Sequence, residues 1–379
     1  NGSVIRGHII QLSPNLEQRD YFARASGVAR FDYNWALEAW QDIYLVHTMD
    51  PSIPNTSEME LRRELNALKE KEFPWMLEVT KCAPQMAIQN LGKAFKNFFE
   101  KKGQYPRFKA KGRDDRFTIS NDHFKVDGKK IRLPHIGWVS MREELRFQGK
   151  ILSATVSKVA DRWFVSIAVE SGPIHSKPAK NHGKVGVDLG VNTLATLWKD
   201  DGRVEKIAGP RPMNNLLPRL QMLVQALARK VQGSNSRKKA RLKLARLYAR
   251  MANIRLDTLH KLTSMLSSNY STVVIEDLDV RGMLAPRKSG LLKRRKRGLA
   301  RSIADMGFSE FRRQLEYKMS ARGGELLVAD RYFPSSKQCS ECKLVFKELK
   351  QGQQTWTCMG CKTVHDRDTN ASHNLWMLG

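Results

Sequence analysis

The stretch KVGVDLGVNTLAT, residues 184–196, decides the fold of the second half of the chain. Its apolar start predicts a short buried strand over 184–189 that carries Asp188 near its end. The run TVVIED predicts a second buried strand over 272–277 that carries Glu276. An unpaired acid is costly inside a buried strand, but at a carboxyl end it can project into the crevice where α/β sheets place their sites. Each acid alone could also be a strand-end cap or a salt-bridge partner.

A third acid comes from the segment HDRDTNAS, residues 365–372. We expect a final helix to start near residue 368, so that Asp368 lies in its first turn, where the helix dipole favours a carboxylate. Asp366 is the alternative third acid, and its competing roles are an N-cap or a group behind the site. Three converging carboxylates repel one another unless a divalent cation lies between them, and hard cations such as Mg²⁺ prefer oxygen ligands. Two such ions about 4 Å apart can hydrolyse a phosphodiester.

The spacing of the cysteines predicts a second metal site. The chain has five cysteines, and four of them form two Cys-x-x-Cys pairs separated by fifteen residues. This pattern predicts one tetrahedral zinc ion, with the ligands Cys339, Cys342, Cys358 and Cys361. Because four thiolates leave no open position, we expect the zinc to be structural. Cys82 stands apart as a packed small residue, and the usage as a whole fits a reducing, cytoplasmic compartment.

The charge of the chain indicates its partner. The 379 residues include 66 Lys and Arg against 38 Asp and Glu, a net charge of +28. So positive a field favours a polyanion, and nucleic acid is the obvious candidate. A basic ribosomal-type protein is the plain alternative. The sequence has no run of about 18 apolar residues, so we expect no transmembrane helix and no membrane partner.

Three basic runs, at 101–113, 229–250 and 293–297, predict where nucleic acid binds. Lysine and arginine in such runs contact phosphates, and aromatic side chains beside them can stack on unpaired bases. A solvated surface is the alternative for each run. The residues expected to make these contacts are Tyr105, Arg107, Lys109, Arg237, Lys238, Lys239 and Arg241.

Periodicity divides the chain into several domains of a multidomain α+β protein. Helical spacing of apolar residues predicts an all-helical insertion, and the alternating runs after it predict a small β-barrel that the strand at 4–12 joins. The later α/β pattern surrounds the cysteine module. The expected boundaries are 1–16 with 103–178 for the barrel, 17–102 for the helical insertion, 179–334 with 366–379 for the α/β domain, and 335–365 for the zinc module.

In this order, the motifs GVDLGVNTLAT, VVIEDL, the paired Cys-x-x-Cys and DRDTNAS resemble the transposon-encoded TnpB family. The likeness extends to YPRFK at 105–109, YFPSSKQCSEC at 332–342 and KAFKNFF at 93–99, and so covers almost the whole chain. Members of this family are compact RNA-guided DNA nucleases related to type V CRISPR effectors.

The resemblance implies a RuvC nuclease domain of RNase H type, a wedge barrel and a helical recognition insertion. It implies a transposon-derived guide RNA, a short motif read beside the target on duplex DNA, and Mg²⁺-dependent cleavage, with two ions expected and no protein oligomer required. It carries the catalytic triad onto Asp188, Glu276 and Asp368, and so favours Asp368 over Asp366.

Motif recognition would fall between the insertion and the barrel. We expect it at Lys81, Gln85, Ser120 and Asn121, for which ordinary surface polarity is the alternative. Two other functions remain possible from the sequence: an RNA-guided repressor without nuclease activity, and a transposase that joins DNA strands. The repressor would be marked by the loss of one triad acid.

Overall fold

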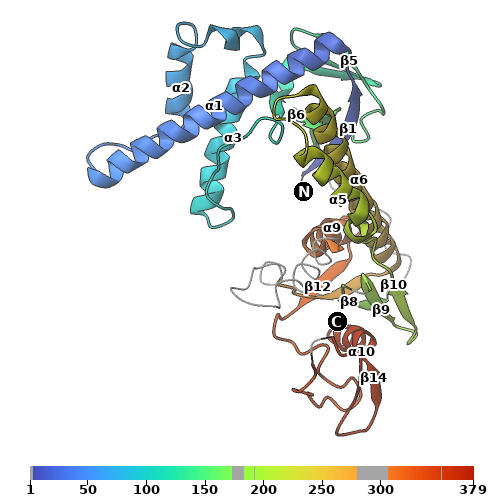
Figure 1. Ribbon diagram of the computed structural model, residues 1–379. Helices are drawn as coiled ribbons and strands as arrows, with labels where there is room; N and C mark the ends of the chain where they lie inside the picture. Colours follow the sequence, from blue (N-terminus) through green and yellow to red (C-terminus); the bar gives the residue numbers. More distant parts are fainter. Residues whose placement is uncertain (1–2, 173–182, 192, 280–305, 351) are drawn as a thin grey trace. The chain divides into compact units, whose positions relative to one another are not determined.

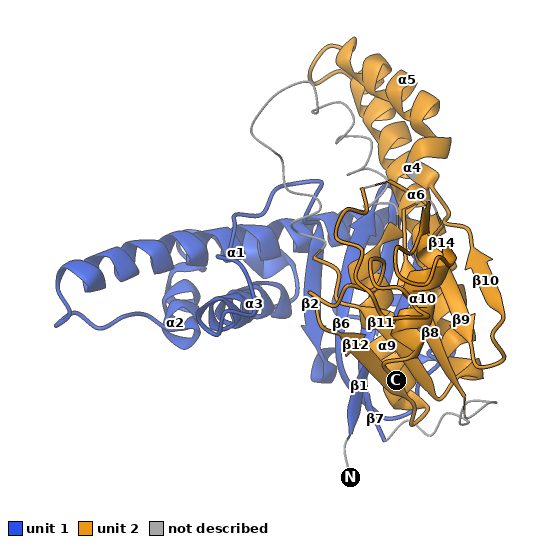
Figure 2. Cartoon of the chain, turned by 90° about the horizontal axis from the view of Figure 1, so that it is seen from below, with its two compact units in different colours: residues 1–173 blue, residues 174–379 orange. Residues whose placement is uncertain are grey.

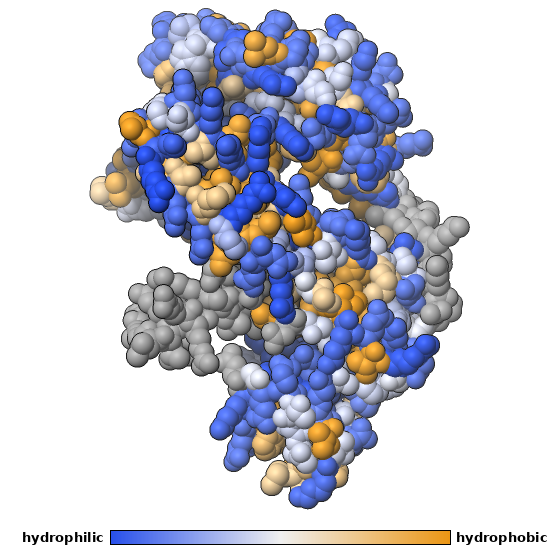
Figure 3. Space-filling model, turned by 45° about the vertical axis from the view of Figure 1, so that its right-hand side comes forward, coloured by the Kyte–Doolittle hydropathy of each residue, from blue (hydrophilic) through white to orange (hydrophobic). Residues whose placement is uncertain are grey.

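The computed structural model describes residues 3–172, 183–191, 193–279, 306–350 and 352–379, so the basic run at 293–297 lies outside the described residues. The chain divides into two compact units, Asn1–Pro173 and Ile174–Gly379 (Figure 2). Each unit has its own apolar core. On the face drawn in Figure 3, hydrophilic side chains predominate and hydrophobic ones are scattered in small groups.

The first unit contains a seven-stranded antiparallel sheet with the order β2-β6-β7-β1-β5-β4-β3 (Figure 1). The expectation that the strand at 4–12 joins the later strands is confirmed, because β1 pairs with β7 on one side and β5 on the other. The strands are β1 (Val4–Ser13), β2 (Arg116–Ser120), β3 (Lys125–Asp127), β4 (Lys130–Leu133), β5 (Gly137–Met141), β6 (Lys150–Val159) and β7 (Arg162–Ser171).

Helices fill the chain between β1 and β2, as the periodicity predicted. They are α1 (Leu16–Met49), α2 (Glu58–Leu68) and α3 (Cys82–Phe99), with the short 3₁₀ turn η1 (Pro74–Glu78) between α2 and α3. A second 3₁₀ turn, η2 (Asn121–His123), follows β2. A capping box begins α1 at Asn15, and another begins α2 at Ser57, where the side chain of Glu60 reaches back to the Ser57 amide. Apolar side chains of α1 and α3 then pack with the inward side chains of the sheet into one core.

The second unit is built on a five-stranded mixed sheet with the order β10-β9-β8-β11-β12. Strands β8, β11 and β12 run parallel to one another, and β9 and β10 are antiparallel to their neighbours. The strands are β8 (Lys184–Leu189), β9 (Ala195–Lys199), β10 (Val204–Ile207), β11 (Thr272–Glu276) and β12 (Glu325–Ala329). A small hairpin of β13 (Thr355–Thr357) and β14 (Val364–Asp366) belongs to the cysteine module.

The described helices of this unit are α4 (Pro212–Asn215), α5 (Leu217–Ala228), α6 (Asn235–Asn269), α9 (Phe308–Ala321) and α10 (Arg367–Trp376). Helices α4 and α5 pack on α6, and the other helices cover the two faces of the sheet. Side chains of α6 and α9 share a core with Val187 of β8 and Ile275 of β11. Leu375 of α10 packs with Val274 of β11, whose side chain points the other way. One face of the sheet therefore belongs to α6 and α9, and the opposite face to α10.

Local signals divide the helices of this unit. Proline stands in the first turn of both α4 and α5, and Gly233 takes a left-handed φ of 84° between α5 and α6. Helix α9 follows the left-handed Gly307.

Candidate metal centres and nucleic-acid surfaces

Two of the predicted acids lie side by side on the sheet of the second unit. Strands β8 and β11 are parallel neighbours, and their register runs from Lys184 opposite Thr272 to Val187 opposite Ile275. Asp188 and Glu276 are the next residues on each strand. Since alternate side chains point to opposite faces, both acids project to the face that α10 covers. The sequence predicted each strand end, and the register shows that the two ends are level.

Helix α10 approaches this face unusually closely, which brings in the third acid. A Cβ atom on Gly186 of β8 would collide with the carbonyl oxygen of Ser372 and the backbone of Trp376, so only glycine allows the contact. Asp368 lies in the first turn of α10, as predicted. The carboxylates of Asp368 and Glu276 both raise the pKa of Asp188, after burial, which is the larger cause. The three acids are therefore electrostatic neighbours.

Hydrogen bonds separate the two candidates for the third acid. Asp366 is the N-cap of α10: its Oδ1 accepts from the Thr369 amide at 2.9 Å, and its Oδ2 accepts from Lys206 Nζ at 2.9 Å. These contacts outweigh burial and lower the pKa of Asp366. Asp368 has no hydrogen-bond or ion-pair partner among the described residues, and burial followed by Asp366 raises its pKa. Asp366 has a structural role, and Asp368 is the acid left available to a ligand.

The same reasoning distinguishes Glu276 from its neighbour Asp277. Asp277 is held by Arg312 Nη1 at 2.8 Å and by Arg331 Nη2 at 2.9 Å, so its charge is balanced. The contact of Glu276 is weaker, a 3.4 Å hydrogen bond from the hydroxyl of Ser335. Burial raises the pKa of Glu276 in spite of that bond. Glu276 is thus the acid of the pair that faces the site with its charge unbalanced.

The structure adds residues that sequence reasoning missed. Arg367, next to Asp368, lowers the pKa of Asp188, Glu276 and Asp368 against the larger effect of burial. Ser335 and Lys206 hold Glu276 and Asp366, respectively. Arg367 lies in the quoted motif HDRDTNAS, and its position next to Asp368 could have indicated that it belongs to the site. Ser335 lies in the quoted motif YFPSSKQCSEC, whereas Lys206 lies in no quoted motif, and both are distant in sequence from the acids they contact.

The three carboxylates form a set of oxygen donors whose negative charge exceeds the positive charge nearby. Such a set suits a hard divalent cation, which would supply the balancing charge. The acids do not meet at one point in the way the cysteines do. Among the described residues, the four cysteines are the one cluster of potential ligands whose donor atoms converge closely enough for a single ion.

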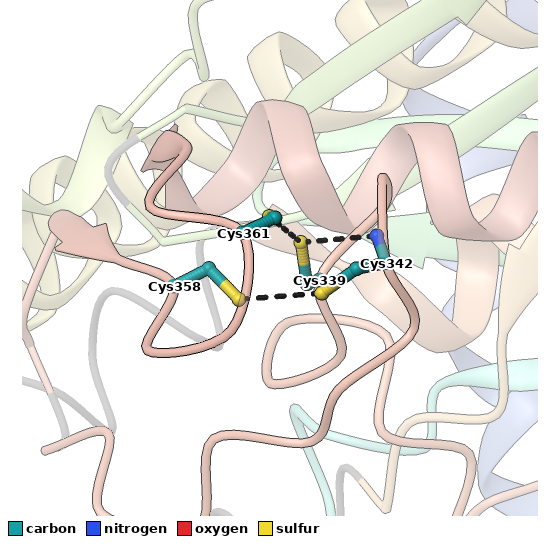
Figure 4. Close-up of side chains that lie close together, drawn as sticks. All are labelled: Cys339, Cys342, Cys358 and Cys361. Carbon is teal, nitrogen blue, oxygen red and sulfur yellow. Dashed lines mark hydrogen bonds between the residues drawn. The ribbon is translucent and has the colours of Figure 1, made fainter.

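The cysteine site is assembled. The Sγ atoms of Cys339, Cys342, Cys358 and Cys361 all lie within 4.8 Å of one another and point toward a common centre (Figure 4). The Cys339–Cys361 and Cys342–Cys358 sulfur pairs are each 3.5 Å apart. Tetrahedral zinc with Zn–S bonds of ~2.3 Å needs sulfurs about 3.8 Å apart, so the geometry fits zinc.

The protein around the sulfurs supports metal binding. Burial raises the pKa of the Cys339 thiol to about 12, whereas hydrogen bonding to Thr363 lowers that of Cys361 to about 6. Nε2 of His365 lies 3.0 Å from the Cys339 sulfur, and the ring of His365 packs on Trp356. An imidazole N–H beside a buried thiolate stabilises its charge, which is the usual role of a group behind a metal ligand.

The four residues proposed for motif recognition fall in two adjoining places of the first unit. Lys81 and Gln85 are at the start of α3, and Ser120 and Asn121 are at the end of β2. Cys82 Sγ lies 3.6 Å from Ser120 Oγ, which joins the two places. Lys81 and Asn121 are exposed there, while Ser120 and Gln85 are half-buried. The four side chains therefore lie near one another on the first unit, and their role in motif recognition stays a prediction.

The basic run at 101–113 divides into exposed and engaged residues. Tyr105 is exposed but packs edge-on against Phe98, with ring centres 5.2 Å apart, and Arg107 is exposed. Lys109 differs: its ammonium lies 3.4 Å from the centre of the Tyr33 ring, and burial lowers its pKa to about 8. The Lys109 ammonium therefore packs on the Tyr33 ring in this structure, a contact that the sequence did not indicate.

The turn between α5 and α6 gathers the other predicted contacts. A hollow of ≈ 360 Å³ there is lined in part by Arg237, Lys238 and Arg241. Arg237 Nη1 donates to the Leu227 and Lys230 carbonyls at 3.0 and 2.8 Å, so it ends α5. Lys238, Lys239 and Arg241 are exposed.

None of the helices in the described ranges combines the length and hydropathy of a membrane span.

Known proteins resemble the chain over nearly its whole length. A candidate RNA-guided DNA endonuclease of Streptomyces pristinaespiralis is 36% identical over 99% of this chain and 90% of its own. Another, of Escherichia coli (strain K12), is 34% identical over 97% of this chain and 91% of its own. A TnpB-like protein of Acanthamoeba polyphaga mimivirus is 24% identical over 51% of the chain. The chain belongs to the TnpB family.

Three family descriptions match along the chain. Residues 166–286 match the family described as "Probable transposase", and residues 308–375 match the Cas12f1-like TNB domain. Residues 3–45 match a family described as a helix-turn-helix domain, yet the structure has a strand and one continuous helix there, β1 and α1. That description does not fit the backbone of this region.

A solved structure confirms the fold class in its broad form. The protein chain of a Cas12f1–sgRNA–target DNA complex is 14% identical, covers 96% of this chain and 83% of its own, and has a TM-score of 0.54. At this identity the likeness establishes the fold alone. The fold is Cas12f-like and has mixed α/β content. Its TNB domain corresponds to residues 308–375.

Proposed function

We propose that this protein is an RNA-guided DNA endonuclease of a transposable element. It binds a transposon-derived guide RNA, recognises a short motif beside its target in duplex DNA, and hydrolyses DNA with Mg²⁺. The observation that carries the proposal is the placement of Asp188, Glu276 and Asp368 on one face of the sheet, at the ends of two parallel strands and in the first turn of the helix over them. Relatives described as candidate RNA-guided DNA endonucleases, and the net charge of +28, support the nucleic-acid partners.

The proposed domains follow the sequence boundaries. The seven-stranded sheet serves as the wedge barrel, residues 17–102 as the recognition insertion, and residues 335–365 as the zinc module. The sheet of the second unit serves as a RuvC domain of RNase H type. The support is that β8 forms an antiparallel pair with β9 and a parallel pair with β11, and that Asp188 and Glu276 lie at the ends of β8 and β11. A cytoplasmic location accords with these partners.

In the proposed mechanism the three carboxylates hold the metal ions, of which we expect two. When bound, Mg²⁺ activates water and stabilises the leaving oxygen of the scissile phosphate. Asp188 and Glu276 fix the position of the site through the rigid register of β8 and β11, and Asp368 completes it from α10. Arg367 adds positive charge beside the acids, where the phosphate must approach.

The test begins with the protein purified from the cells that make it. Sequencing the RNA that co-purifies identifies the guide, and a plasmid with the matching target is then incubated with the complex in Mg²⁺ or in EDTA. We expect cutting in Mg²⁺ alone, and none by the Asp188→Ala complex. Absence of bound RNA, or cutting that survives Asp188→Ala, would overturn the proposal. DNA binding without cutting would identify a repressor, and joined element ends would identify a transposase.

A further inference from the structure

The segment Ser335–Ser340 links the two candidate metal sites of the second unit. It follows β12 and contains the first cysteine ligand, Cys339. Its backbone is tightly turned, since the amides of Lys337 and Gln338 both donate to the Pro334 carbonyl, at 3.0 and 2.8 Å. These two hydrogen bonds to one carbonyl fix the turn at the start of the segment.

Two asparagines of α10 hold this segment. Asn370 and Asn374 lie one turn apart and are each 2% exposed. Asn374 Nδ2 donates to the carbonyl oxygens of Ser335 at 2.8 Å and Gln338 at 2.6 Å. Asn370 Nδ2 donates to the same Gln338 oxygen at 2.7 Å, and its Oδ1 accepts from the Ser340 amide at 2.9 Å. The contacts surround Cys339 on both sides in sequence.

The other contacts of these residues lead to the carboxylates. The hydroxyl of Ser335 donates to Glu276 Oε1 at 3.4 Å. Asn370 stands two residues after Asp368 on α10. One buried set of hydrogen bonds therefore joins a zinc ligand, the strand-end glutamate and the helix that carries the third acid. Breaking it would leave buried backbone carbonyls without donors, which costs about 1–3 kcal/mol each.

We propose that Asn370 and Asn374 are positioning residues that couple the cysteine site to the carboxylate site. The metal in the cysteine site fixes the position of the segment Ser335–Ser340. Through the hydrogen bonds of Asn370 and Asn374, this segment in turn fixes the positions of the Glu276 and Asp368 carboxylates. The inference rests on the proposed function, which assigns these acids to Mg²⁺. It predicts that zinc occupancy sets the affinity of the carboxylates for a divalent cation, although zinc itself takes no part in the reaction.

The experiment measures Mn²⁺ binding by electron paramagnetic resonance, with the zinc-loaded full chain bound to its RNA. Asn374→Ala removes two donors at once, and Ser335→Ala removes only the hydroxyl on Glu276. We expect both variants to bind Mn²⁺ at the carboxylates about tenfold more weakly than the wild type, as is usual when groups behind metal ligands are lost. Zinc content should stay at one per chain. Asn253→Ala, an exposed asparagine on α6, is the matched control and should bind Mn²⁺ normally.

A reciprocal measurement tests the coupling itself. Removing zinc with a chelator should weaken Mn²⁺ binding to the wild type, and should weaken it little further in Asn374→Ala, because the link is already cut. Non-additivity of this kind is the signature of coupled groups. In cleavage assays, Asn374→Ala should need more Mg²⁺ for half-maximal rate and recover most of the rate at saturation, which a general loss of structure would not allow.

Three outcomes decide the matter. Unchanged Mn²⁺ affinity in both Asn374→Ala and Ser335→Ala overturns the coupling, as do additive effects of zinc removal and Asn374→Ala. If Asn374→Ala fails to fold, Ser335→Ala alone carries the test, since it deletes a single hydroxyl. Asp188→Ala should abolish the Mn²⁺ signal. If it does not, the assignment of the carboxylates fails, and that failure is distinct from failure of the coupling.

Discussion

Each unit of the protein has an aspartate whose pKa is raised by burial of its carboxyl group, and the two aspartates differ in the groups around them. Asp32, on α1 in the first unit, is fully buried, and burial alone raises its pKa to about 8. Neither of its carboxylate oxygens has a hydrogen-bond partner among the described residues. Burial also raises the pKa of Asp188, in the second unit, and the nearby acids Asp368, Glu276 and Asp366 raise it further, each by less than burial does. A buried carboxyl group without neighbours indicates only that its charged form is unfavourable in a core. A carboxyl group that lies near acids from other segments indicates a candidate site.

The largest expected effect tests which acids of the second unit belong to the site. We expect Asp368→Asn to lower the single-turnover rate of DNA cleavage by on the order of 10³-fold or more, the scale typical for loss of an essential catalytic group. The matched change Asp366→Asn should cost less than about tenfold, because asparagine serves equally well as an N-cap. A larger loss from Asp366→Asn would reverse the assignment.

The second prediction concerns zinc and the independence of the units. Cys339→Ser should lower the zinc content below one per chain and lower the unfolding temperature of the second unit, since structural zinc contributes directly to folding. The first unit should unfold at its usual temperature, observed as a separate calorimetric transition. Cys82→Ser, outside the cluster, should keep its zinc. If both transitions move together after Cys339→Ser, the units are not independent.

The third prediction concerns the pH dependence that Asp32 gives the first unit. Its pKa is 3.8 when exposed in the unfolded chain and about 8 in the folded unit. Between these values the folded state retains a proton that the unfolded state releases, so stability falls as pH rises from about 4 to 8. At pH 8 the accumulated loss is on the order of a few kcal/mol.

Asp32→Asn should remove this slope and raise the unfolding temperature of the first unit at pH 8. Thermal unfolding at several pH values between 5 and 8 measures it. The control is Asp42→Asn, at an exposed position on the same helix, which should keep the wild-type slope. DNA cleavage at 25 °C should be unchanged by Asp32→Asn, in contrast with Asp368→Asn. A wild-type slope in Asp32→Asn would show that this acid is not what makes the first unit pH-sensitive.

The smallest expected effect concerns the basic turn of the second unit. Lys238→Ala should weaken RNA binding a few-fold and reduce the slope of log affinity against log salt by about 1, because one phosphate contact is lost. Lys261→Ala is the control on the same helix, where the ammonium is paired with Asp257 at 2.6 Å. Filter binding at several salt concentrations measures both. Equal slopes for the two variants would remove the α5–α6 turn from the RNA surface.

The sequence predicted most of the elements because local signals specify them. Ser57 and Glu60 form a capping box that begins α2, and alternating apolar runs became β6 and β7. The cysteine ligands were predictable for the same reason, since each pair is local. The register that makes Asp188 and Glu276 level depends on contacts between distant segments, and no local signal contains it.

Some roles were beyond sequence reasoning for physical reasons. Lys109 stands in a basic run like any exposed lysine, and only the fold places it on the Tyr33 ring. Asp32 lies on α1, and a charged residue on a helix is expected at the surface, yet Asp32 is fully buried. Ser335 lies in the quoted motif YFPSSKQCSEC, but its role depends on its contact with Glu276, which the motif does not indicate. Each of these side chains is defined by a neighbour far away in sequence.

The central position of β1 in the first sheet has a consequence for synthesis of the chain. Val4 pairs with Ser171, and the pairing continues to Gln11 opposite Phe164. Strand β1 leaves the ribosome well before β7, and at ~5–20 residues per second the delay is roughly 10–30 s. Helix α1, with its own cap, can form at once. During this interval the edge of β1 that pairs with β7 has no partner, and such an unpaired edge is a template for aggregation.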